Sequence, residues 1–176
     1  MNKIDFNKKE VYTDGKLTGI YLGMTIDGSE PTSSYFDPVE FVAATVGISR
    51  CINTFFFTCS CGVAGCAGIF HGIHVKYRRH TVEWRDKDKP RNLKQRYYVF
   101  DKNEYRAAIA KCTTLMFEIA KEQDAIHKEL IASNDDIEEY YHRYDGSVGN
   151  VPGTSESMIL SSIQYRQNWL RNHCLL

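Results

Sequence analysis

Residues that favour β-strands are concentrated in the first hundred positions, where turn-forming dipeptides separate them. The segment 16–26 is rich in such residues, and Asp-Gly dipeptides stand before it at 14–15 and after it at 27–28. Because Asp-Gly favours the tight turns of β-hairpins, we expect a pair of strands within residues 1 to about 30.

Further strands are expected between this pair and the middle of the chain. Runs of β-branched and aromatic residues lie at 55–61, 69–77, 81–85 and 95–100. The second and third runs flank the polar segment 78–80, Arg-Arg-His, and are predicted to form a hairpin around it.

One helix is expected among these strands. The segment 37–40, Asp-Pro-Val-Glu, combines an acid at the N-cap position, a proline at the first helical position and a glutamate at the third. We predict that the helix runs to about residues 48–50 and turns Val39, Val42 and Val46 toward the core.

Helical spacing of hydrophobic residues begins after the last of these strands. Residues 101–104, Asp-Lys-Asn-Glu, resemble a capping box, and a helix is predicted from there to about Ala132, with a break near Asp124 as an alternative. A short helix through Tyr144 and an amphipathic helix over 155–172 follow. The inward residues are predicted to be Tyr105, Ile109, Cys112, Met116, Ile119, Ile159, Ile163 and Trp169.

These elements predict an α+β fold, with an antiparallel sheet in the N-terminal half, one inserted helix, and a helical C-terminal part. Residues 1–100 are expected to form a strand-rich core, and residues 101–176 a helical part packed on or appended to the same domain. A chain of 176 residues, 43% of them hydrophobic, can bury a core without disulfides.

The sequence also bears on localisation. Its first nine residues, MNKIDFNKK, lack the hydrophobic region of a signal peptide, and the apolar stretch 41–48 is too short to cross a bilayer. We therefore expect a cytoplasmic protein that does not bind membranes, and in that compartment its six cysteines should be mostly reduced.

Three cysteines, Cys59, Cys61 and Cys66, lie close together with two glycines between the second and third. On a strand the first two would face the same side, and the glycines permit a tight turn that returns the third to them. Three thiolates are typical ligands of zinc, and His71 or His74 could supply the fourth. The spacing differs from the common zinc knuckle, so a redox pair or simple packing of small side chains remains an alternative.

This knuckle, C-x-C-G-x-x-G-C, is followed by Val82-x-Trp84 and then by Phe100-Asp101 and Tyr105. The pattern resembles a group of bacterial proteins without an assigned function, which carry the same knuckle before a V-x-W strand and an F-D-x-x-x-Y junction. The resemblance covers about residues 57 to 120. It implies a similar local structure in these proteins and no particular reaction.

Signs of catalysis are weak in this sequence, which contains no P-loop, dinucleotide-binding fingerprint, nucleophile elbow or metalloprotease helix. A dyad of Cys66 and His71 is conceivable, but no neighbouring acid or oxyanion element supports it. We therefore expect a protein without enzymatic activity, and either no cofactor or zinc.

Charge is balanced overall, with 22 basic and 22 acidic residues, but it is unevenly distributed. Residues 76–96 contain nine basic and three acidic residues, a net charge of +6, whereas residues 118–145 contain nine acidic and three basic residues, a net charge of −6. The basic segment also contains aromatic residues that could stack on nucleic-acid bases, namely Tyr77, Trp84, Tyr97 and Tyr98.

The acidic segment predicts a protein partner with a basic surface, because tyrosines among charges of one sign are typical of interfaces. The leading hypothesis is a non-enzymatic inhibitor or immunity-type protein of bacterial or phage origin. Its alternatives are a zinc-binding module, with Cys59, Cys61, Cys66 and His71 as ligands, and a nucleic-acid binder through the hairpin 76–96. The predicted partner-binding residues are Asp135, Asp136, Glu138, Glu139, Tyr140, Tyr141 and Tyr144.

Overall fold

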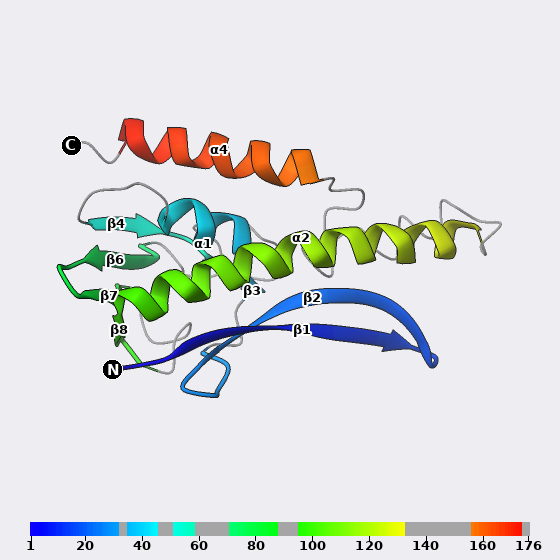
Figure 1. The fold of residues 1–176 in the computed structure, drawn as a ribbon, viewed down its shortest axis with the longest axis horizontal. Helices are drawn as coiled ribbons and strands as arrows, with labels where there is room; N and C mark the ends of the chain where they lie inside the picture. The colour runs from blue at the N-terminus through cyan, green and yellow to red at the C-terminus, as the bar shows by residue number, and fades with distance from the viewer. Residues whose placement is uncertain (32–34, 46–50, 59–70, 88–94, 133–155, 174–176) are drawn as a thin grey trace.

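Strands and helices pack against each other in the computed structural model, which describes residues 1–31, 35–45, 51–58, 71–87, 95–132 and 156–173 (Figure 1). The main sheet is antiparallel and has the order β4 (Cys51–Thr54), β6 (Ile73–Tyr77), β7 (Thr81–Asp86), β8 (Tyr97–Asp101). The other strands form two pairs, β1 (Ile4–Thr13) with β2 (Lys16–Ile26) and β3 (Tyr35–Phe36) with β5 (Phe57–Thr58). The helices within the described residues are α1 (Pro38–Thr45), α2 (Lys102–Ala132) and α4 (Glu156–His173). The predicted α+β fold is confirmed.

Helix α2 is the longest element, and it lies along the ribbon formed by β1 and β2 (Figure 1). Helix α1 packs against both α2 and α4. The helix predicted from the capping box is confirmed, because the Asp101 Oδ1 accepts hydrogen bonds from the backbone N–H of Asn103 at 2.8 Å and of Glu104 at 3.1 Å. The alternative break near Asp124 does not occur, since α2 is continuous to Ala132.

The β1–β2 ribbon confirms the predicted strand pair. Its turn residues Asp14 and Gly15 have φ angles of 51° and 77°, the positive values that a two-residue type I′ turn requires. The ribbon joins the main sheet through Asn2, whose backbone N–H donates to the Val99 carbonyl at 2.7 Å. The Asn2 Oδ1 accepts from the Val99 N–H at 2.8 Å, so the side chain continues the hydrogen bonding of strand β8.

The core is an aromatic cluster centred on Trp84. Its ring centroid lies 4.8 Å from that of Phe100 and 4.9 Å from that of Phe56, and its indole N–H donates to the Tyr105 hydroxyl at 3.1 Å. The same core includes Ile159 on α4, so residues of both halves of the chain are buried together.

The single strand predicted over 55–61 is wrong in its described part. Strand β4 ends at Thr54, and β5 begins at Phe57 after an irregular step. Phe56 and Phe57 are both buried, although successive side chains of a regular strand point to opposite faces. The chain therefore bends there to place both rings in one core.

The predicted inward positions of the helices are confirmed where they are described. Val42 on α1, Cys112 and Met116 on α2, and Ile163 on α4 are buried. The predicted end of the first helix at residues 48–50 and the short helix through Tyr144 lie outside the described residues. None of the helices in the described ranges is both long and apolar enough to cross a membrane.

Candidate functional site

One face of the main sheet is turned away from the core and carries polar side chains. Alternation along the strands buries Val75, Trp84 and Phe100, and it directs their neighbours to the other side. We call this surface the open face, and it consists of Asn53, His74, Lys76, Thr81, Glu83, Arg85, Tyr97, Val99 and Asp101.

The pairing register aligns four of these residues across all four strands. Asn53 lies opposite His74, His74 opposite Arg85, and Arg85 opposite Tyr97. The His74 Nδ1 lies 2.8 Å from the Asn53 Oδ1, and the Arg85 guanidinium carbon lies 5.9 Å from the centre of the Tyr97 ring, within reach of a cation–π contact. The row therefore presents an amide, an imidazole, a guanidinium and a phenol side by side.

A second row places Lys76, Glu83 and Val99 beside the first. The Arg78 Nε donates to the Glu83 Oε1 at 3.0 Å, and this hydrogen bond lowers the pKa of the Glu83 carboxyl. Lys76, directly opposite Glu83, also lowers the pKa of this carboxyl, so the cation of the open face away from Glu83 is Arg85, with Lys87 at its edge.

The surroundings of His74 lower the pKa of its imidazole ring. This pKa is lowered first by partial burial of the ring and then by the positive charges of Lys87, Arg85 and Lys76. The lowered pKa favours the neutral imidazole, and the charges of Lys87, Arg85 and Lys76 around it would attract an anion.

The described helices pack on the opposite side of the sheet. There the Trp84 ring meets Phe41 of α1 at 6.0 Å and Tyr105 of α2 at 5.9 Å. On the open face, in contrast, 44% of the Tyr97 surface is exposed. Among the described helices, the contacts with the Trp84 ring therefore lie on the side opposite the open face.

The aromatic residues of the basic segment do not act as one stacking surface. Trp84 and Tyr98 are only 0% and 3% exposed, so the expectation that they stack on nucleic-acid bases is wrong. Tyr77 is half-buried, with its ring 6.4 Å from that of Tyr105. Tyr97 alone of the four is exposed, because it lies one residue from Tyr98 and therefore on the other face of β8.

The predicted metal ligands are only partly described. Cys59, Cys61 and Cys66 lie outside the described residues, while His71 is exposed before the start of β6 and His74 is on the open face. Among the described residues no group of three or more His, Cys, Asp or Glu side chains could hold a metal ion. The zinc site stays a prediction.

The predicted acidic interface lies outside the described residues in its entirety. The predicted partner-binding residues are Asp135, Asp136, Glu138, Glu139, Tyr140, Tyr141 and Tyr144, and their role stays a prediction.

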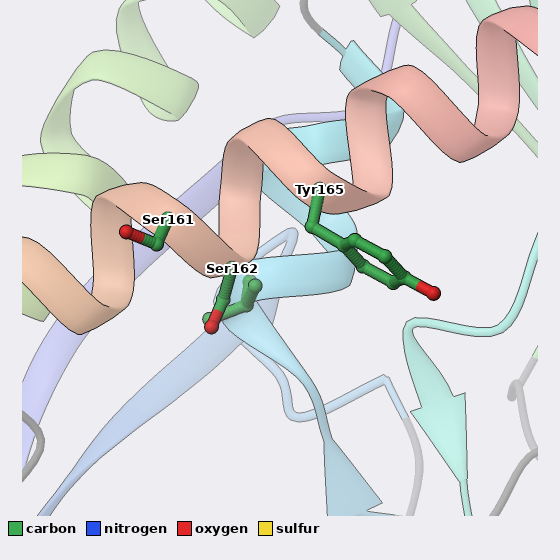
Figure 2. Close-up of a pocket in the computed structure, with 4 residues that line it drawn as sticks. Ser161, Ser162 and Tyr165 are labelled. Carbon is green, nitrogen blue, oxygen red and sulfur yellow. The ribbon is translucent and has the colours of Figure 1, made fainter.

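A shallow pocket of about 400 Å³ lies between α1 and α4 (Figure 2). It is lined by Val39, Ser161, Ser162 and Tyr165, and the sequence patterns did not indicate it. The lining offers hydroxyl groups but no acid or base to activate them, and no charge to hold an ion.

No protein-family model, curated protein or solved structure matches the chain. The resemblance to bacterial proteins with the same cysteine knuckle therefore stays a prediction.

Proposed function

We propose that this protein works by binding an anionic macromolecule on the open face, and not by catalysis. The observation that supports this proposal is the row Asn53–His74–Arg85–Tyr97, which crosses four strands on the side of the sheet away from the described helices. Hydrogen-bond donors and an exposed ring beside excess cations are suited to recognition of an anionic partner.

The positive charge on and beside the open face also supports this proposal. Lys76 and Arg85 on the open face and Arg78 and Lys87 beside it give four cations against the two carboxylates of Glu83 and Asp101, a net charge of +2. Because Arg78 is paired with Glu83, the remaining cations are available to steer an anion toward the sheet.

Charge reversal tests this proposal. The double variant Lys76→Glu, Arg85→Glu should weaken binding to heparin, polyglutamate or RNA at least tenfold and should lower the salt dependence by about two ionic contacts. Arg85 is exposed and Lys76 is half-buried on the open face away from the core, so the circular dichroism spectrum should not change. Affinity is measured by fluorescence anisotropy at several salt concentrations.

The matched control is Lys16→Glu, Lys121→Glu, which changes the net charge equally at exposed positions at the start of β2 and on α2. It should bind the same polyanions almost as well as the wild type. Equal losses in the two double variants would mean that net charge and not the open face governs binding, and the proposal would be wrong.

A second candidate function follows from the sequence. The net charge of −6 over residues 118–145 supports an inhibitor or immunity-type protein that uses the acidic, tyrosine-rich segment against a basic protein. The two functions can coexist, because each uses a different segment of the chain.

A further inference from the structure

We propose that the anionic partner of the open face is a single-stranded nucleic acid, with one unpaired base stacked on Tyr97. This inference rests on the proposed function, and it adds the chemical class of the partner. It is carried by Tyr97, the exposed aromatic ring that the β7–β8 register places beside Arg85.

Tyr97 has the properties of a stacking platform. Its ring is 44% exposed, and the Arg85 guanidinium lies 5.9 Å from the ring centre. Rings and guanidinium planes are the two protein surfaces on which nucleic-acid bases stack, and such stacking tolerates any base. Lys76 and Lys87 can then contact the adjoining phosphates.

The shape of the site favours a single strand over a duplex. Four strands spaced about 4.8 Å apart give the row a length of about 14 Å, enough for a few nucleotides. A duplex is read by a helix or ribbon that enters a groove, whereas the row lies on a sheet surface. Unpaired bases can instead lie flat on the sheet, where Asn53 and His74 can bond to their edges.

An acidic protein segment would use this surface differently. It would pair with Lys76 and Arg85, but its carboxylates would not stack on the exposed aromatic ring. The contribution of Tyr97 to binding therefore separates the two classes of partner.

The experiment compares wild-type protein with Tyr97→Ala and, as the matched control, Tyr97→Phe. The probes are a labelled single strand of about 12 nucleotides, within the usual range of site sizes, a duplex of the same length, and polyglutamate. The wild type should bind the single strand most tightly. Tyr97→Ala should weaken that binding about 5- to 100-fold, as expected for the loss of one stacked base, and should leave polyglutamate binding unchanged.

Tyr97→Phe should stay within about twofold of the wild type, because the ring is kept. A 2-aminopurine base in the single strand should be quenched by the wild type and by Tyr97→Phe, and not by Tyr97→Ala. Quenching reports stacking directly, which a merely structural role of Tyr97 would not produce.

The outcomes distinguish this inference from the proposed function. If Tyr97→Ala binds the single strand as the wild type does, or if polyglutamate or the duplex binds more tightly, the partner is not a single strand, although the open face still binds anions. If none of the probes binds, or if Lys76→Glu, Arg85→Glu binds as the wild type does, the proposed function itself is wrong.

Discussion

Burial in the core keeps ionisable side chains in their uncharged forms. Trp84 donates its indole N–H to the Tyr105 hydroxyl, and burial raises the pKa of Tyr105 well above its ordinary value. Cys112 lies on the same buried side of α2, and burial raises the pKa of its thiol to about 12. The core therefore tolerates these groups only in their uncharged forms.

Cys112 should make folding sensitive to alkaline pH. In the unfolded chain the thiol ionises near its ordinary pKa of 9.0, whereas in the folded protein it stays protonated up to about pH 12. Its stabilising contribution is complete below pH 9 and is lost between these two values, by about 1 kcal/mol per pH unit. Denaturant unfolding of wild type and Cys112→Ala at about pH 8, 9 and 10 measures the difference in slope.

The alanine variant is expected to lose stability by a constant amount from the cavity that it creates. Its free energy of unfolding should lack the pH-dependent contribution of the thiol. Parallel slopes for the two proteins would show that Cys112 is not the titrating group.

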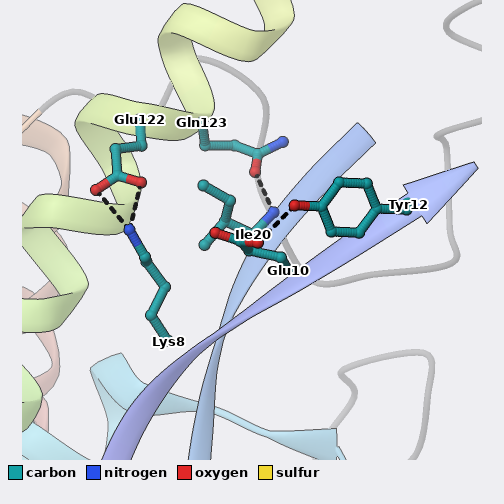
Figure 3. Close-up of polar contacts among 6 residues, drawn as sticks. All are labelled: Lys8, Glu10, Tyr12, Ile20, Glu122 and Gln123. Atoms are coloured by element: carbon teal, nitrogen blue, oxygen red, sulfur yellow. Dashed lines mark hydrogen bonds and ion pairs between the residues drawn. The ribbon is translucent and has the colours of Figure 1, made fainter. Parts of the chain in front are cut away.

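At the scale of elements, two contacts of unequal strength join the ribbon to α2 (Figure 3). The Lys8 Nζ lies 2.7 Å from the Glu122 Oε2, but both side chains are partly exposed and the ion pair is screened by water. The neighbouring Gln123 is buried, and its Oε1 accepts a hydrogen bond from the Ile20 N–H at 2.8 Å. The buried hydrogen bond to Gln123 should contribute more to the free energy of unfolding than the ion pair, because its loss removes the acceptor of an N–H that is shielded from water.

We therefore expect Gln123→Leu to lower the free energy of unfolding by about 1–3 kcal/mol, since the Ile20 N–H loses this acceptor. Glu122→Gln, one residue away, should lower it by less than about 1 kcal/mol. Denaturant unfolding gives both values, and hydrogen exchange of the β2 amides should accelerate only in the leucine variant. A larger loss from Glu122→Gln would reverse this ranking.

For the whole molecule, a formal net charge of zero hides two regions of opposite sign. The open face lies mainly in the basic region, and together with Arg78 and Lys87 its cations outnumber the carboxylates of Glu83 and Asp101. Binding of either partner should depend on salt, because exposed charges beyond about 10 Å are screened at 0.1 M ionic strength.

The acidic segment can be tested independently of the open face. Charge reversal of Asp135, Asp136, Glu138 and Glu139 should abolish capture of a basic protein partner without unfolding the domain, because the favourable charge is replaced by repulsion. Pull-down from the native host with wild-type and variant protein provides the measurement, and the Lys76→Glu, Arg85→Glu variant should still capture that partner. Undiminished capture by the reversed segment would rule out its proposed role.

Local signals in the sequence determined the secondary structure well. The Asp14-Gly15 turn, the cap at Asp37 and the cap at Asp101 were all predicted and are present, because each depends on residues close together in the chain. The α+β class followed from the same signals.

The tertiary structure alone decided which side chains reach the surface. Tyr97 and Tyr98 look alike in the sequence, but the register of β8 against β7 exposes the first and buries the second. The bend between β4 and β5, the bond from Ile20 to Gln123 and the link from Asn2 to Val99 likewise join distant or differently packed segments. A hydrophobic pattern predicts that a residue favours burial. Strand register and packing determine on which face of the sheet its side chain lies and which residues it contacts.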